Sequence, residues 1–425
     1  MNSKWSHLVL LVVLVITLAV VTAGIILPVS AGKTKGTGTG QAPGARDTVT
    51  PVSASADDQE EPAMDLTEDQ MDELQHEIDT SPTYAAPASS PPVPRGSLSL
   101  LPDLPYIPKE RNQGKCADCW VWASTGAIEI EHTIKSGISD RLSVQYFNDN
   151  FGSGTEGEDS ACCGGSASRF ADWYSNKTAN PEAMKLVPWS NTNAAFIPGQ
   201  SCNSPLPPGK PVSTTPSYQM SRLSVATVST FGVDKSAAIN NIKSALKSGL
   251  PVLYGFGYDT NDMKAFKQWW HSQPDTAVWD PSPYAGDGGG EGHVTLLVGY
   301  DDKTDPENPY WLVVNSWGAP PNRPDGTFRL SMDMDYTAAI KNPGSNGKSP
   351  PRQQQSFRII DAAFVDTPGT PVAGSLSPGS GITVTGTSPA SGTPAATQRA
   401  GAGTLPVFGA LVLAGIFFHG KRGRA

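Results

Sequence analysis

The chain has 425 residues, of which 38% are apolar and 17% charged, and it contains 43 glycines and 38 prolines. This composition predicts one globular core with long flanks that lack regular structure, and it argues against several packed domains. The net charge of −9 is local, because residues 57–79 hold eleven carboxylates and no Lys or Arg, and this acidity argues against nucleic-acid binding.

An apolar run opens the chain. Residues 8–29 carry no charge, Lys4 precedes them, and Val29-Ser30-Ala31 is a small-residue pattern suited to signal-peptidase cleavage. Residues 1–31 are therefore interpreted as a signal peptide, which predicts an extracellular or cell-surface protein. The run is also long enough to cross a bilayer, so an uncleaved signal anchor, giving a membrane-anchored protein, stays open.

Residues 32–100 are predicted to precede the core. Residues 32–56 are mainly Gly, Thr, Ala, Ser and Pro, a composition that predicts a disordered spacer. In the acidic part that follows, Thr67 and Gln70 match a capping box, and an apolar stripe is formed by Met71, Leu74 and Ile78. These features predict one short amphipathic helix over residues 67–79.

The predicted core begins near Leu101 and soon reaches a loop with two cysteines. The loop reads Asn112-Gln113-Gly114-Lys115-Cys116-Ala117-Asp118-Cys119-Trp120, and apolar residues then recur at helical intervals up to a capping Gly137. Cys119 is therefore expected in the first turn of a helix, where unpaired N–H groups and the helix dipole would lower its thiol pKa. We interpret Cys119 as a nucleophile; a structural or redox Cys-x-x-Cys pair is the alternative.

A histidine and an asparagine lie at the ends of later apolar runs. His293 stands in Gly292-His293-Val294-Thr295-Leu296, and Asn315 in Val313-Val314-Asn315-Ser316-Trp317. Both runs predict strands, whose ends hold side chains rigidly. A cysteine nucleophile needs a base and a group that orients the base, and these two residues can fill those roles.

Four sequence blocks in this order resemble the papain-like cysteine peptidases, the family that includes the cathepsins. They are NQGKCADCW, LSVQYFNDN, GHVTLLVGYDD and VNSWG, and the resemblance covers Leu104 to Asp366. It implies an α+β, two-lobe papain-like fold over residues 101–366, with the Cys helix in a helical lobe and His and Asn in an antiparallel β-sheet lobe. The patterns agree: helices are predicted over 142–150, 166–174 and 235–247, and strands over 251–258, 293–300, 310–315, 327–331 and 357–364.

The resemblance also implies roles for single residues. Cys119 matches the nucleophile, His293 the general base and acid, and Asn315 the residue that orients the imidazole. Gln113 matches the oxyanion-hole glutamine, and Trp317 matches the indole that covers the Asn–His hydrogen bond. Gly164 and Gly165 match the glycine pair that binds the substrate strand. Protein or peptide substrates are implied.

The five cysteines are an odd number, so one thiol should stay free. The resemblance implies a Cys116–Cys162 disulfide. Cys202 matches a family cysteine whose usual partner would fall at Asn150, so neighbouring Cys163 is inferred to replace that partner. Other pairings remain open, since sequence does not fix connectivity.

Two departures from the family pattern stand out. Asp118 replaces a small residue next to the nucleophile; an anion there would raise the thiol pKa unless it turns away to cap the helix, and the cap is expected. His293 and Asn315 also lie farther from Cys119 than usual, so insertions are expected at residues 261–283 and 301–309, where they could reshape the cleft.

The acidic helix is interpreted as an inhibitory prosegment; a solvated helix without a partner is the alternative. At the other end, residues 367–404 are rich in Thr, Pro, Gly and Ser and predict an extended stalk. Residues 405–425 combine an apolar run with a basic end, and resemble prokaryotic surface-sorting tails of the archaeosortase or exosortase type.

The sequence thus favours a secreted, surface-tethered cysteine endopeptidase that works through a thioester acyl-enzyme. A catalytically silent surface binding protein of the same fold is the alternative. A monomer is expected, with membrane association through the terminal segments. Neither a cofactor nor a metal is expected, because the other histidines lack ligand spacing.

Overall fold

The computed structural model describes residues 61–87, 91–154, 160–177, 180, 182–202, 210–284, 290–340 and 351–365. The predicted signal segment, the spacer before residue 57, the stalk and the apolar tail lie outside these ranges. Across the ranges that are described, no helix has the length and apolar character needed to cross a membrane.

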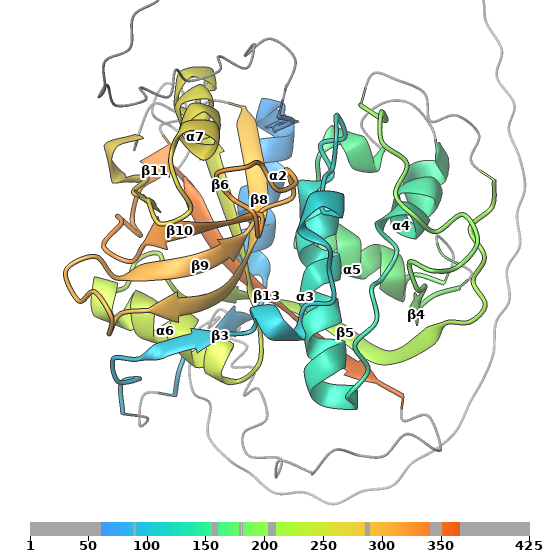
Figure 1. Ribbon diagram of the computed structural model, residues 1–425, viewed down its shortest axis with the longest axis horizontal. Helices are drawn as coiled ribbons and strands as arrows, with labels where there is room; N and C mark the ends of the chain where they lie inside the picture. The colour runs from blue at the N-terminus through green and yellow to red at the C-terminus, as the bar shows by residue number, and fades with distance from the viewer. Residues whose placement is uncertain are drawn as a thin grey trace, which may run out of the picture. The chain divides into compact units, whose positions relative to one another are not determined.

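One side of the protein is built from helices around α3 (Cys119–Ser136). The first fourteen residues of α3 are all buried, and the helix ends where Gly137 takes a left-handed conformation with φ 67°. Beside it lie α4 (Val144–Asn150) and α5 (Ala167–Ser175), each N-capped by a serine side chain, and Figure 1 shows all three on the same side of the sheet. Short 3₁₀ helices cover 101–103, 108–110, 151–154, 161–163 and 282–284.

The other side is one large sheet in the order β2-β5-β13-β6-β8-β9-β10-β7. Its strands are β2 (Thr83–Tyr84), β5 (Tyr218–Val228), β13 (Gln355–Phe364), β6 (Val252–Tyr258), β8 (Glu291–Asp301), β9 (Tyr310–Val314), β10 (Thr327–Ser331) and β7 (Val278–Trp279). Neighbouring strands are antiparallel except at the two ends, where β2–β5 and β10–β7 are parallel. The helices and the large mixed sheet confirm the predicted α+β class.

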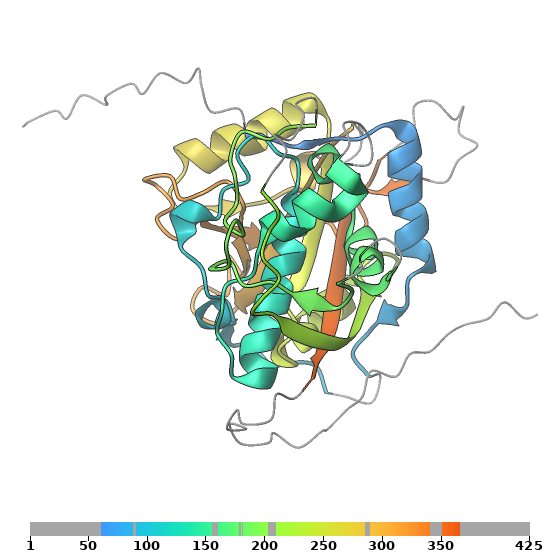
Figure 2. The same cartoon turned by 90° about the vertical axis from the view of Figure 1, so that its right-hand side faces the viewer.

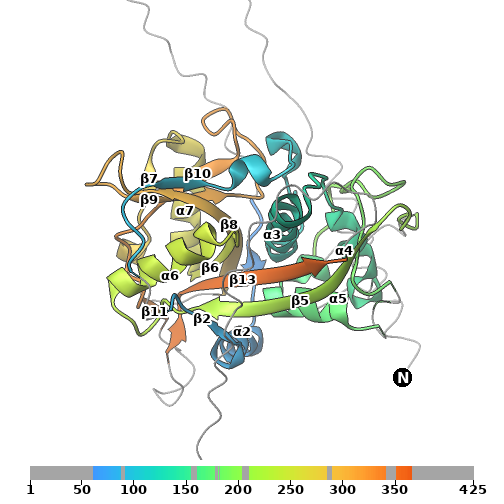
Figure 3. The same cartoon turned by 90° about the horizontal axis from the view of Figure 1, so that it is seen from below.

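The two sides meet along α3. Its buried face contacts β8 and β13, and the long strands β5 and β13 continue beneath it as far as α5 (Figure 3). Two further helices, α6 (Lys235–Lys247) and α7 (Thr260–Ser272), pack against the sheet. Since α3 bears Cys119 and β8 bears His293, this contact fixes both residues in one region.

Most of the long elements agree with the sequence. The bounds of α6 and β10 are as predicted, and β6, β8, β9 and β13 differ by a few residues at their ends. The sequence missed β5 and α7. α7 fills the expected insertion at 261–283, where its N-cap Asp259 accepts a hydrogen bond from the Asp262 backbone. Two small pairings complete the fold: β4 (Lys185–Leu186) with β5, and β11 (Ala339–Ile340) with β12 (Arg352–Gln353).

The described part of residues 61–100 packs on the core. Helix α2 (Glu68–Thr80) forms with both hydrogen bonds of the Thr67–Gln70 capping box, as predicted. However, three short strands around it join the sheet: β1 (Met64–Asp65) and β3 (Ser97–Ser99) pair with β8, and β2 pairs with β5. These short strands show that the segment before Leu101 packs on the sheet, while the predicted start of the core near Leu101 stays a prediction. Strands of two or three residues are too short for periodicity to reveal them.

Candidate active site

His293 and Asn315 form a buried pair on neighbouring elements. His293 lies in β8, and Asn315 directly follows β9. His293 Nε2 is 2.8 Å from Asn315 Oδ1, and the Trp317 ring stacks on the imidazole at 4.4 Å between centroids. Burial lowers the pKa of His293 to about 4, although the Asn315 hydrogen bond opposes this shift. The imidazole is therefore neutral in this structure.

Cys119 is the first residue of α3, as predicted, and it is the one free thiol among the five cysteines, all of which are described. The backbone N–H of Val294, next to His293, donates a hydrogen bond that favours the Cys119 thiolate. Cys119 and the histidine strand are thus brought together. The expected low thiol pKa is wrong for this structure: complete burial raises the pKa of Cys119 to about 12 and outweighs the helix N-terminus.

Gln113 is held in place by Ser316. The Ser316 hydroxyl donates to Gln113 Oε1 at 2.5 Å, and the Gln113 backbone N–H donates to the Ser316 carbonyl at 2.9 Å. This fixes the amide, whose Nε2 donates one hydrogen to the Cys116 carbonyl at 2.7 Å. An amide Nε2 carries two hydrogens, and this bond uses one of them. Sequence analysis did not single out Ser316, although its position between Asn315 and Trp317 could have indicated it.

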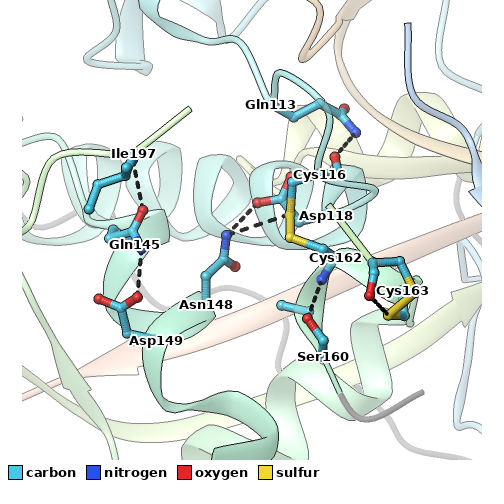
Figure 4. The surroundings of a disulfide bond; sticks show 12 residues. Gln113, Cys116, Asp118, Gln145, Asn148, Asp149, Ser160, Cys162, Cys163 and Ile197 are labelled. Atoms are coloured by element: carbon cyan, nitrogen blue, oxygen red, sulfur yellow. Dashed lines mark hydrogen bonds between the residues drawn. A yellow bond between two sulfur atoms is a disulfide. The ribbon is translucent and has the colours of Figure 1, made fainter. Parts of the chain in front are cut away.

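Asp118 does not cap the helix as expected. It occupies the N-cap position of α3 but accepts no hydrogen bond there from the helix backbone. Its buried carboxyl instead receives a hydrogen bond from Asn148 Nδ2 in α4, at 2.6 Å from Oδ2 (Figure 4). Burial raises the pKa of Asp118 to about 8. The competing partner is thirty residues away in sequence, so local pattern could not reveal it.

Both predicted disulfides form: Cys116–Cys162, which the resemblance implies, and Cys163–Cys202, in which Cys163 was inferred to replace the family's usual partner. Figure 4 shows the first bridge beside the Asp118–Asn148 pair. It ties the loop that precedes Cys119 to residues 161–163, directly before the glycine pair. The first bridge therefore holds the loop before Cys119 against residues 161–163.

The glycine pair is required by close packing. A Cβ on Gly165 would lie 2.6 Å from the Trp120 ring, and Gly164 has φ 93°, which disfavours other residues. A Cβ on Gly164 would lie 3.0 Å from Leu66 and 3.3 Å from Met64. The surface expected to bind a substrate strand thus faces the protein's own N-terminal segment.

That segment, residues 61–66, covers the site as an added strand. Met64 pairs with Gly292 and Asp65 with Glu291, and the Leu66 N–H donates to the Gly290 carbonyl at 2.7 Å. At its start, Glu61 lies 3.0 Å from His271 of α7. Both the Met64 and Leu66 side chains are buried.

Helix α2, drawn in blue in Figure 2, continues the cover. Two arginines hold it by ion pairs. Arg352 lies 2.8 Å from Glu68 and 2.6 Å from Asp72. Arg358 lies 3.2 Å from Glu77 and donates to the Ser81 hydroxyl at 2.7 Å. The predicted stripe of Met71, Leu74 and Ile78 lines a pocket that also contains Gly165, Gly292 and His293.

The inserted α7 supports the indole. The rings of Phe266 and Trp270 lie 5.6 and 6.1 Å from Trp317, and both side chains are fully buried. Arg323 donates from Nε to the Trp270 carbonyl at 2.9 Å. Sequence analysis marked this insertion but missed its role in packing Trp317. As for metals, the described ranges contain no group of three His, Cys, Asp or Glu side chains arranged to hold an ion.

Comparison with known proteins adds an independent finding. The family model described as Papain family cysteine protease matches residues 104–346, more than half of the chain. Among curated proteins, the chain is similar to Cysteine proteinase 3 of Solanum lycopersicum, at 25% identity over 52% of this chain and 51% of that protein. It is also similar to Cathepsin J of Mus musculus, at 28% identity over 58% and 65%, and to Procathepsin L of Felis catus, at 26% identity over 55% and 60%.

The chain spans from about half to less than two-thirds of the length of these relatives. Among solved structures, one from a study titled "Structural basis for the limited antibody cross reactivity between the mite allergens Blo t 1 and Der p 1" has a TM-score of 0.42. The sequence identity is 16%, and the match covers 68% of this chain and 77% of the other.

Proposed function

The chain belongs to the papain family of cysteine proteases, and from this we propose that it hydrolyses peptide bonds with Cys119 as the nucleophile. One observation carries the proposal. The imidazole of His293 is bonded to Asn315 through Nε2, while its Nδ1 has no hydrogen-bond partner in the described part of the chain. Asn315 thereby fixes the orientation of the ring and leaves one nitrogen for the thiol proton.

The proposed steps follow from these positions. His293 takes the Cys119 proton, and the sulfur attacks the peptide carbonyl carbon to give a tetrahedral oxyanion. The Cys119 backbone N–H and the Gln113 amide would donate to that oxygen. His293 then returns the proton to the departing amine, leaving a thioester. Water, deprotonated by His293, hydrolyses the thioester to a carboxylic acid and regenerates the thiol.

We further propose that this structure is a closed form. The segment 61–66 occupies the surface of the glycine pair, and α2 closes the pocket beside His293. In this form burial favours the neutral thiol and the neutral imidazole, so the reactive ion pair is disfavoured. Departure of the segment would admit water and substrate together. This supports the interpretation of the acidic segment as an inhibitory prosegment.

The proposed location is the cell surface. Two disulfides favour an oxidising compartment, and the apolar run at 8–29 with the stalk and tail after residue 366 suit secretion followed by tethering. Fractionation of cells that express the full chain, with protease shaving of intact cells, tests this. Recovery of the protein only from the cell interior would refute it.

Labelling with an epoxysuccinyl thiol inhibitor tests the peptidase proposal. We expect one label on Cys119, located by peptide mapping, and none in Cys119→Ala. His293→Ala should also slow labelling strongly, because the base that activates the thiol is lost. Absence of label in the wild-type protein, after the segment has been displaced, would instead favour the silent binding protein. Two features keep that alternative open: the closed cleft and the carboxyl beside the nucleophile.

A further inference from the structure

Asp118, the residue before the nucleophile, is buried in surroundings that suit an uncharged side chain better than a carboxylate. Asp118 has no exposed surface, and Asn148, which is also buried, donates the hydrogen bond to its Oδ2. Its Oδ1 forms no hydrogen bond of ordinary distance and angle with a described residue, although the Trp122 indole N–H and the Asp118 backbone N–H lie near enough to favour the anion. These contacts compensate a carboxylate only in part, because burial is the largest influence on the pKa of Asp118, whereas a carboxylic acid needs much less compensation.

The neighbouring elements supply no positive charge. Within the described ranges, Asp118 takes part in no ion pair with Lys, Arg or His. On its own helix the nearest titratable group is Cys119. In α4, Asp149 accepts a hydrogen bond from Gln145, and Cys116 in the loop is part of a disulfide (Figure 4). His293 of β8 is neutral in this structure.

We propose that Asp118 is held as an uncharged carboxylic acid beside the nucleophile, and that its ionisation in alkaline solution disfavours the Cys119 thiolate. This inference rests on the proposed function, in which Cys119 is the nucleophile. It makes Asp118 a positioning residue, which acts through Cys119, and not a catalytic residue. Asn148 also takes part, because its amide donates the hydrogen bond that holds the Asp118 carboxyl in place.

The sign of the effect follows from the charges. Burial raises the pKa of Asp118 to about 8, so the group is neutral in acidic and neutral solution and becomes an anion above that pH. A negative charge at Asp118 raises the pKa of Cys119, because two adjacent anions repel. The thiolate is therefore favoured while Asp118 keeps its proton, and is opposed once that proton leaves.

Asp118→Asn is the decisive variant, because Asn has the size of Asp, can pair with Asn148 and cannot ionise. Infrared difference spectra of the full chain, wild type minus Asp118→Asn, should show a protonated carboxyl band at about pH 6 that disappears above about pH 8. Absence of this band at about pH 6 would overturn the proposal.

Alkylation of Cys119 by iodoacetamide gives the second readout, since Cys119 is the one free thiol. The ratio of the rates, Asp118→Asn over wild type, should be near unity at about pH 6 and rise roughly three- to tenfold by about pH 9. Asp149→Asn, which removes the neighbouring carboxyl of α4, should give a ratio that does not change with pH. A pH-independent ratio for Asp118→Asn would refute the coupling.

Neither readout requires turnover. A protein that shows both effects but hydrolyses no peptide would contradict the proposed function and leave the inference standing. A protein that hydrolyses peptides with no carboxyl band would contradict the inference alone.

Discussion

At the residue scale, the amide of Gln113 is fixed from both sides by Ser316 and Cys116. Gln113→Ala should leave substrate binding nearly unchanged and lower kcat by roughly 10²- to 10³-fold, because the lost donor acts on charge that forms only in the transition state. Steady-state kinetics on the opened enzyme measure this. An effect confined to KM would show that Gln113 binds substrate and does not stabilise the oxyanion.

The sequence located most of the site residues but not their environments. Cys119, His293, Asn315 and Gln113 stand in distinctive blocks, and the structure brings these blocks together. The helix-capping role expected for Asp118 was wrong, because Asn148 of another helix competes for the carboxyl. The low pKa expected for Cys119 was wrong as well, because complete burial of the thiol outweighs the backbone N–H groups that favour its thiolate.

At the element scale, α2 depends on Arg352, whose buried side chain pairs with the largely exposed Glu68 and Asp72. Because such partly exposed pairs contribute about 1 kcal/mol, Arg352→Gln should speed iodoacetamide labelling of Cys119 by about fivefold.

Arg222→Gln is the matched control for that change. Arg222 pairs with Asp361 of β13 at 2.6 Å and not with α2, so its loss should leave the labelling rate unchanged. Equal rates for Arg352→Gln, Arg222→Gln and the wild type would show that α2 is not held by its ion pairs.

The inserted helix α7 gives a second prediction at this scale. Phe266 is fully buried against Trp317, Phe256 and Phe328, so Phe266→Ala should leave a cavity and lower the free energy of unfolding by about 3–5 kcal/mol. Denaturant unfolding measures this, with the partly exposed Phe231→Ala as a control that should change by less than about 1 kcal/mol. A small loss for Phe266→Ala would mean that α7 does not support the indole.

Whether the sequence revealed an element depended on its length and local chemistry. The helix α2 was predictable because its capping box and apolar stripe are both local. The strands β1, β2 and β3 were not, because two or three residues owe their conformation to the strands that they join. The strand β5 was missed although it has eleven residues, since its exposed and buried positions do not alternate regularly.

At the scale of the whole molecule, one chain supplies both the site and its cover. The sheet that presents His293 also accepts β1 through the same strand, β8, so the cover uses the main-chain groups that an extended peptide would use. The family resemblance predicted the two-part fold. It did not predict that the preceding segment would be built into the sheet, because this depends on contacts between residues more than two hundred positions apart.

The central claim is that Cys119 belongs to a peptidase site closed by residues 61–80. Hydrolysis of internally quenched peptides tests it most directly, in the wild type, in Met64→Asp/Leu66→Asp, and in that double variant with Cys119→Ala. Two charges cannot stay buried against the glycine pair, so the double variant should open and hydrolyse peptides at least about tenfold faster than the wild type. The version without Cys119 should be inactive. Hydrolysis without Cys119, or no hydrolysis by a folded, opened protein that retains both disulfides, would contradict the account.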